Sequence, residues 1–109
     1  METLSFLKNY NNKFCCDVFT TIRPHKPSRK VGDMVTLKLK LASGTMISEK
    51  GKIRHVSTML LKDIPECVLA TDTGMGRTLA MQLFRDIYSK YGIDADSTKF
   101  DIIVLTHEN

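Results

Sequence analysis

The chain has 109 residues, of which 42% are hydrophobic and 26% charged, a composition typical of one soluble globular domain. No apolar run approaches the ~20 residues of a membrane-spanning helix, which argues against an integral membrane protein. The first residues lack the basic start and long apolar stretch of a signal peptide, and three unpatterned cysteines do not form a secreted disulfide framework. We therefore expect a cytoplasmic protein with no membrane partner.

The net charge of +4 is distributed unevenly along the chain. Residues 1–54 hold eleven Lys and Arg against four Asp and Glu, whereas residues 55–109 hold five against eight. We expect a surface that binds a polyanion to lie in the basic half. The histidines and cysteines lack the paired spacing of a zinc site, so no metal and no other cofactor is expected.

The basic half predicts one short helix followed by strands. Apolar residues between Leu4 and Phe14, including Leu7, recur at spacings of three to four, which predicts a short amphipathic helix. Residues 18–22 are rich in β-branched and aromatic side chains and predict a strand that Pro24 ends. Residues 34–41 alternate between apolar and polar, so one face of this strand should be buried while its lysines face water.

The second half predicts two more strands, a long helix and a last strand. Strands are expected at residues 45–47 and 52–61, with a turn between them, and Pro65 ends this region. Residues 76–91 carry an apolar stripe at helical spacing, and residues 100–105 predict the final strand. The expected fold is a single α+β domain over residues 1–109. It would be a small β-barrel of about six strands, with one short N-terminal helix and one longer C-terminal helix.

The most informative segment is the end of the strand at residues 18–22. Thr20, Thr21 and Arg23 place two hydroxyls and a guanidinium at one lip of the sheet. The loop that follows adds three cations: Lys26, Arg29 and Lys30. Hydroxyls and the planar N–H donors of a guanidinium suit phosphate oxygens or the edge of a base. The segment therefore predicts a site for an anionic, nucleotide-like ligand.

Two short motifs precede the long helix. Asp72-Thr73-Gly74 is the tripeptide of aspartic proteases, but its position late in the chain and before a helix favours a helix-capping turn. Gly74-Met75-Gly76-Arg77 could hold a phosphate at the start of a helix, although it lacks the Lys-Ser/Thr of a P-loop. At the mouth of a barrel, Arg77 could reach a bound nucleotide.

The order of these pieces resembles the ASCH domain, a branch of the PUA-like β-barrels. That family pattern is a short helix, a strand with Lys-Thr-x-Thr-x-Arg, a Gly-Asp turn into an alternating strand, an acidic loop, a helix ending near Tyr, and a last strand. The matching pieces here are residues 6–14, 18–23, Gly32-Asp33 with residues 34–41, the loop through Asp72, residues 77–91 and residues 100–105. The resemblance covers nearly the whole chain and implies a PUA-like fold with a ligand site at the barrel mouth.

The resemblance is closest to small ASCH enzymes that hydrolyse acetylated cytidine with a lysine, a threonine and a glutamate. Thr21 and Arg23 fall on the family's threonine and arginine. The lysine position holds Val18, which cannot exchange a proton, and the glutamate position holds Thr73 with Asp72 beside it. Because an enzyme that loses its proton-exchanging residue loses most of its rate, the resemblance implies binding without catalysis.

An amine from Lys13 or Lys26 would have to enter from another direction to replace the missing lysine. The leading hypothesis is a non-catalytic module that binds RNA or a nucleotide. Its expected ligand-binding residues are Thr20, Thr21, Arg23, Lys26, Arg29, Lys30, Asp72 and Arg77, and no catalytic residue is assigned. One alternative is an amidohydrolase acting on modified nucleosides, and a second is a small protein-interaction domain.

Overall fold

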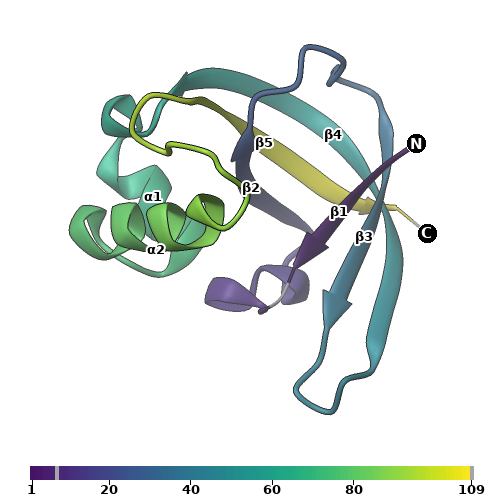
Figure 1. Ribbon diagram of the computed structural model, residues 1–109. Coiled ribbons are helices and arrows are strands. Elements are labelled where there is room, and N and C mark those ends of the chain that lie inside the picture. The colour runs from purple at the N-terminus through teal and green to yellow at the C-terminus, as the bar shows by residue number, and fades with distance from the viewer. Residues whose placement is uncertain (7, 109) are drawn as a thin grey trace.

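The computed structural model describes residues 1–6 and 8–108. In chain order the elements are β1 (Glu2–Phe6), the 3-10 helix η1 (Tyr10–Cys15), β2 (Val18–Pro24), β3 (Met34–Lys40), β4 (Met46–Leu60), the 3-10 helix η2 (Leu61–Asp63), α1 (Glu66–Thr73), α2 (Arg77–Ser89) and β5 (Lys99–Glu108). The fold is α+β, as predicted. Its strands form one sheet that curls into a half-barrel, with α1 and α2 together on one side (Figure 1).

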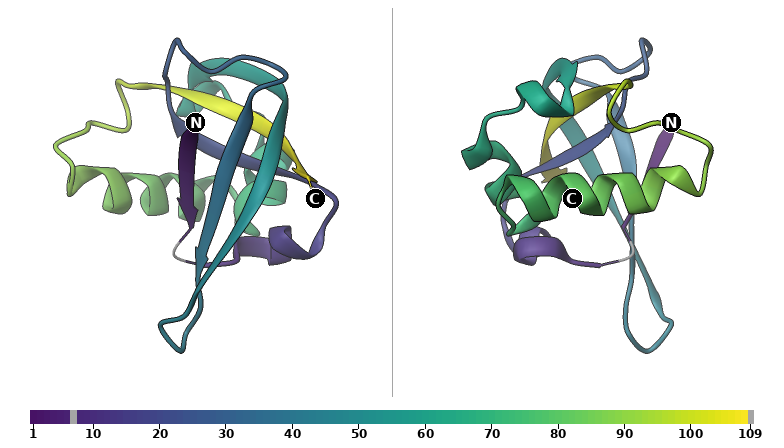
Figure 2. Two further views of the ribbon diagram at one scale, coloured as in Figure 1. Left: turned by 90° about the vertical axis from the view of Figure 1, so that its right-hand side faces the viewer. Right: turned by 60° about the vertical axis from the view of Figure 1, so that its left-hand side comes forward.

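The sheet has the order β1-β3-β4-β5-β2, in which only the β1–β3 pair is parallel. The described part of the chain has five strands, not about six. Most of residues 45–47 and 52–61, which were predicted as two strands, belong to the single strand β4, and Leu61 already begins η2. The expected turn between them stays extended because it pairs with β3 through Leu37↔Glu49 and Val35↔Gly51. The β3–β4 hairpin extends away from the rest of the molecule (Figure 2).

The predicted N-terminal helix is also shorter than expected. Leu4 and Phe6 belong to β1, where their inward-facing side chains are buried, and the helical part is confined to η1. An apolar pattern over so few residues is compatible with both a strand and a helix. This segment forms a strand because it pairs in parallel with β3, where Leu4 lies opposite Leu37. Leu7, which contributed to the helical pattern, lies outside the described residues.

The helical side of the molecule was predicted in part. α2 confirms the helix expected at residues 76–91, and Gly92 follows it with a φ of +70° while the Ile93 amide bonds the Tyr88 carbonyl at 3.1 Å. α1 was not predicted. It begins after Pro65 and ends at Gly74, whose φ of +75° makes it the left-handed cap, so the Asp72-Thr73-Gly74 motif is a helix-capping turn, as favoured from the sequence.

Two groups of buried apolar residues hold these layers together. The first lies between the sheet and the helices: Ile22, Leu61, Ile64, Leu69, Ala80, Met81, Phe84, Ala95, Phe100 and Ile102. The second fills the inside of the curled sheet: Leu4, Phe6, Phe19, Val35, Leu37, Leu39, Ile53, Ile103 and Leu105. Among the residues that the structure describes, no helix has the length and apolar character that crossing a membrane requires.

Side chains join the two edge strands of the sheet, β1 and β2. Arg23 on β2 donates a 2.7 Å hydrogen bond from Nη2 to the Ser5 carbonyl of β1. Just beyond β2, Arg29 forms an ion pair with Glu2 of β1, with 2.8 Å between Nη2 and Oε2. The opening of the half-barrel is therefore bridged by guanidinium groups, and the site described below lies beside this bridge.

Candidate functional site

A cavity of about 520 Å³ lies where β1, β2, α1 and α2 meet. This volume is within the range of small-molecule pockets in proteins. Aromatic side chains form part of its wall: Phe6, Phe84, Tyr88 and Tyr91. Polar and charged side chains from the other elements face the same space: Ser5, Lys8, Lys13, Thr21, Arg23, Asp72 and Thr73. A mostly apolar cavity with a few converging polar groups is the usual form of a ligand site.

The most buried polar contact of the cavity is an ion pair between Lys13 of η1 and Asp72 of α1. Lys13 Nζ donates to Asp72 Oδ1 at 3.0 Å and to the Thr20 carbonyl at 2.9 Å, and both charged side chains are only 6% exposed. Burial lowers the pKa of the Lys13 ammonium, and the nearby Arg23 charge lowers this pKa further, while Asp72 opposes the shift. Lys13 therefore releases its proton more easily than an exposed lysine does.

Asp72 keeps one carboxylate oxygen available to a ligand. Thr20 Oγ1 donates to Asp72 Oδ1 at 2.8 Å, so the two described donors, Thr20 and Lys13, both bond the same oxygen. Among the described residues no donor reaches Asp72 Oδ2. A fully buried side-chain oxygen or nitrogen without a hydrogen-bond partner occurs among them only at His107 Nε2, so Oδ2 of Asp72 is not fully buried. Since Asp72 lines the cavity, Oδ2 is an open acceptor at its surface.

Arg23 and Thr21 form the second polar contact of the cavity. Arg23 Nε donates to Thr21 Oγ1 at 3.0 Å, and the guanidinium carbon lies 4.6 Å from the centre of the Phe6 ring. Burial lowers the pKa of Arg23, but a guanidinium stays charged in proteins. Thr21 is 3% exposed and its oxygen accepts from Arg23, so its own hydroxyl proton remains to be donated. The pair thus presents donors next to the Asp72 acceptor.

Three of the residues predicted for the site line the cavity, Thr21, Arg23 and Asp72, and a fourth, Thr20, bonds Asp72 without lining it. They come together because β2 runs beside the C-terminal end of α1, which carries Asp72. Lys13 completes the group, whereas Val18, at the position where the family has lysine, is 56% exposed and does not line the cavity. No local sequence signal marks Lys13, because its partner lies 59 residues further along the chain.

The basic loop does not reach the cavity. Arg29 is held in a separate buried cluster, where it donates to the Pro24 carbonyl and forms ion pairs with Glu2 and Asp101 at 2.8 Å each. Lys26 is exposed and lies 3.5 Å from Glu2, and Lys30 is exposed at the surface of the loop. None of Lys26, Arg29 and Lys30 lines the cavity, and two acidic partners distant in sequence neutralise Arg29. That this loop holds ligand phosphates stays a prediction.

Arg77 is also directed elsewhere. Its guanidinium donates to the carbonyls of Leu61, Lys62 and Ile64, and it therefore caps the η2 segment and does not line the cavity. Its backbone amide donates to Glu66 Oε1 at 3.2 Å. A carboxylate of the protein itself thus occupies the first turn of α2, where an external phosphate was considered from the sequence.

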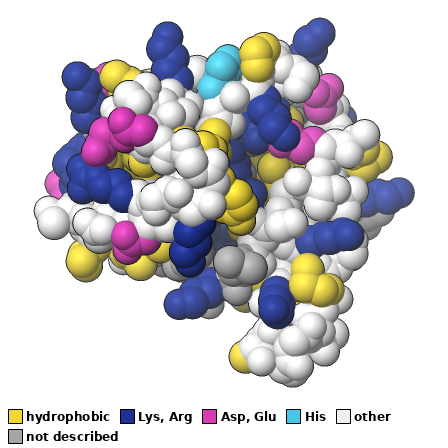
Figure 3. All heavy atoms as spheres, viewed as in Figure 1, with side chains coloured by type: hydrophobic (Ala, Val, Ile, Leu, Met, Phe, Trp, Pro, Cys, Tyr) yellow, Lys and Arg dark blue, Asp and Glu magenta, His cyan; other side chains and the backbone are white. Residues whose placement is uncertain are grey.

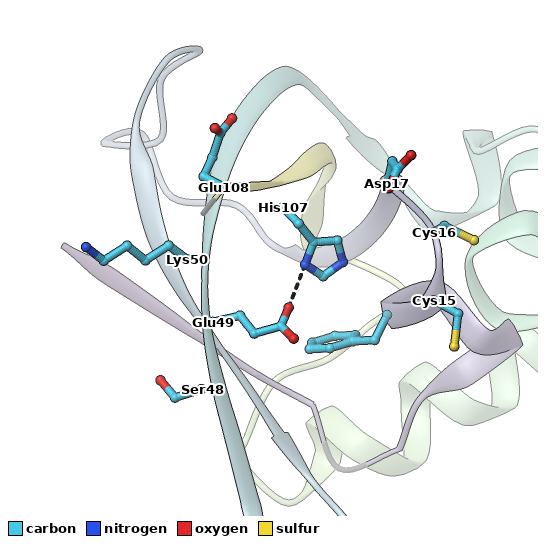
Figure 4. A pocket seen from close by; sticks show the side chains of 9 residues that line it. Cys15, Cys16, Asp17, Ser48, Glu49, Lys50, His107 and Glu108 are labelled. Atoms are coloured by element: carbon cyan, nitrogen blue, oxygen red, sulfur yellow. Dashed lines mark ion pairs between the residues drawn. The ribbon is translucent and has the colours of Figure 1, made fainter.

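A second hollow, of about 470 Å³, is lined by the end of η1 and the residues after it, by β4 and by the end of β5 (Figure 4). Its centre is an ion pair in which His107 Nδ1 lies 2.7 Å from Glu49 Oε2. Cys15 and Cys16 also line this hollow, but their sulfurs point away from the imidazole (Figure 4). This arrangement does not form a Cys–His nucleophilic pair. In the described chain no group of three or more His, Cys, Asp or Glu residues is arranged to hold a metal ion.

Comparison with known proteins gave no match: no family model, no curated protein and no solved structure is similar to this chain. The functional interpretation therefore depends on the geometry of the cavity.

Proposed function

We propose that this protein is a PUA-like (ASCH) module whose cavity binds a nucleotide, either free or as part of RNA. The observation that supports this proposal is one cavity in which aromatic rings face Thr21, Arg23 and the open oxygen of Asp72. Aromatic faces stack on bases, a carboxylate accepts hydrogen bonds from ring or exocyclic N–H groups, and hydroxyl and guanidinium groups donate to base carbonyls or phosphate oxygens.

The charge of the cavity favours an anionic ligand. Lys8, Lys13 and Arg23 line it together with a single acid, Asp72, so the lining carries an excess of positive charge while the lysines are protonated. A phosphate group near Arg23 would offset this excess in a site where burial weakens solvent screening. We expect nucleoside monophosphates to bind more tightly than the corresponding nucleosides, and we expect this difference to shrink as salt is added.

Isothermal titration calorimetry with the four ribonucleoside monophosphates and their nucleosides tests this proposal. Thr21→Val removes the hydroxyl at nearly constant volume and should weaken binding, whereas Lys62→Ala, far from the cavity, should not. Absence of binding for every nucleotide and nucleoside at low salt would contradict the proposal. Equal binding by wild type and Thr21→Val would place the ligand somewhere other than this cavity.

A second candidate is hydrolysis of an acetylated nucleoside, and the specific observation that favours it is the Lys13 amine. Lys13 and Asp72 bring an amine and a carboxylate to the cavity that also contains Thr21, although position 18 lacks the lysine. In this reaction water adds across the amide bond, the acyl carbon leaves as acetate, and the nitrogen gains a proton. Lys13 would first have to release the proton that its ion pair with Asp72 holds, and its amine would then accept a proton from water or from Thr21 as the new bond forms.

Chromatography of acetylcytidine after incubation with the protein separates the two candidates. A binding module leaves the compound intact, whereas the hydrolase releases cytidine and acetate in equal amounts. Lys13→Met should abolish that release if Lys13 is the base. Release that persists in Lys13→Met but disappears in Thr21→Val would assign the proton transfer to another group.

A further inference from the structure

A row of unpaired lysines leads from the cavity onto the outer face of the β3–β4 hairpin. It consists of Lys8, Lys38, Lys40 and Lys50, which we call the lysine track; all four are exposed. Among the described residues no carboxylate lies within 4.0 Å of any of them. Their charge is therefore available to a partner.

The track is continuous with the cavity. Lys8 lines the cavity and also lines a neighbouring groove together with Lys40. Lys38 pairs in register with Ser5, which is itself part of the cavity wall. A chain that leaves the cavity past Lys8 or Ser5 would therefore meet Lys40 and Lys38 next.

Strand geometry places the track on one face of the hairpin. Lys38 and Lys40 alternate with buried Leu37 and Leu39, and two residues along a strand span about 7 Å. Lys50 lies opposite Thr36 on β4 and faces the same way, whereas Glu49 faces inward to His107. Glu108 of β5 pairs directly with Lys50 across the strands, but its carboxylate forms an ion pair with Arg54 at 2.7 Å and lies more than 4.0 Å from the Lys50 ammonium. In the space-filling view, the part of the molecule where the hairpin extends shows Lys and Arg side chains and no Asp or Glu (Figure 3).

From this continuity we infer that the ligand is a single-stranded nucleic acid, with one nucleotide in the cavity and the adjoining phosphates along the lysine track. This inference depends on the proposed function, because the cavity must accept a nucleotide. A single strand is required because a base can enter a cavity between the sheet and the helices only after it leaves the helical stack. Exposed lysines neutralise phosphates without reading their sequence, so the track contributes affinity that depends on salt.

The test compares a nucleoside monophosphate with single-stranded eight-nucleotide RNA and DNA of mixed sequence, measured by calorimetry and by fluorescence anisotropy at several salt concentrations. The double variant Lys38→Ala/Lys40→Ala should bind the oligonucleotide more weakly, and its plot of log affinity against log salt should be less steep by roughly 0.7 for each lysine removed. Binding of the monophosphate should not change, because neither lysine lines the cavity.

A matched control is Lys62→Ala/Lys99→Ala, which removes the same charge at the other end of β4, where Lys99 pairs with Leu60. This control should bind both ligands like the wild type. If the oligonucleotide binds no more tightly than the monophosphate, or if both double variants show the same salt dependence, the lysine track does not bind phosphates. Either result leaves the proposed nucleotide site in the cavity unaffected. If the wild type binds neither the monophosphate nor the oligonucleotide, the proposed function is contradicted as well. Comparison of the RNA with the DNA identifies which nucleic acid is preferred.

Discussion

Lys13 Nζ lies 3.0 Å from Asp72 Oδ1, although 59 residues separate the two in the chain. The contact joins η1 to the end of α1 and fixes one corner of the cavity. Both partners are buried, so each depends on the other for the stabilisation of its charge.

Removing one member of this pair should destabilise the fold. Lys13→Ala leaves the Asp72 carboxylate buried without its cation, and we expect the free energy of unfolding to fall by about 3 kcal/mol. The double replacement Lys13→Met/Asp72→Leu removes both charges and should recover most of that loss. Urea unfolding of Lys13→Met, Asp72→Leu and the double variant measures the coupling, and strictly additive losses would show that the two side chains do not depend on each other.

The ligand site should depend on Arg23 much more than on the hairpin lysines when the ligand is a mononucleotide. Arg23→Ala removes a charged donor from the cavity, and we expect the affinity for a nucleoside monophosphate to decrease by about 1.5–3 kcal/mol, equivalent to roughly ten- to a hundred-fold. Lys40→Ala should leave it unchanged. Calorimetry of both variants provides the comparison. Because Arg23 also bonds the Ser5 carbonyl, a thermal unfolding curve for Arg23→Ala is needed to show that β1 remains in place.

The second ionic cluster should control stability in acid. Asp101 is fully buried and accepts hydrogen bonds from Thr58, the Lys26 amide and Arg29, besides its contact with His25. Burial alone would raise the pKa of Asp101, but these bonds outweigh it and hold the pKa below the ordinary 3.8. A carboxyl whose pKa is lower in the folded state than in the unfolded state stabilises the protein at any pH above its unfolded-state pKa. This stabilisation is lost as the pH falls toward the pKa of the folded state.

Asp101→Asn tests this role. It leaves the buried Arg29 with Glu2 as its one acidic partner among the described residues, and we expect a loss of about 3–5 kcal/mol at neutral pH. As the pH falls below the ordinary value of 3.8, the stability of the variant should decrease less steeply than that of the wild type. Parallel pH profiles for the two proteins would show that Asp101 does not control acid unfolding.

Gly51 should be intolerant of a side chain. A Cβ at this position would lie 2.8 Å from Leu37 Cδ1 and 3.3 Å from the Thr106 carbonyl oxygen, and because Leu37 is fully buried its side chain can shift only by displacing its neighbours in the core. We expect Gly51→Ala to reduce the free energy of unfolding by about 1–3 kcal/mol, as overpacking does. Ser48→Ala, at an exposed position of the same strand, is the control. A Gly51→Ala variant as stable as this control would mean that β3 and β4 separate more easily than the register indicates.

The parts of the fold that could be predicted are those with a strong periodic pattern. The alternation in β3 and the apolar stripe of α2 each extend over enough residues to identify the element. β1 and α1 are short, and their patterns are ambiguous without their tertiary partners. β4 passes through a turn-like sequence because it is paired on both sides, which is information that lies outside the segment itself.

The candidate site was predictable to the same limited extent. Thr21 and Arg23 were expected together because they share one face of one strand. Arg29 was expected to face a ligand because its acidic partners, Glu2 and Asp101, are far away in sequence. Lys13 was considered only as a replacement amine and was not assigned to the site, because its position depends on Asp72, which is distant in sequence.

The nucleotide cavity is tested most directly by two-dimensional NMR of the labelled protein during titration with a nucleoside monophosphate. We expect the largest amide shifts at Thr21, Asp72 and Tyr88, which belong to three different elements and share only the cavity. Shifts confined to the loop from Lys26 to Lys30, or no shifts at millimolar ligand, would contradict the assignment of this cavity as a nucleotide site.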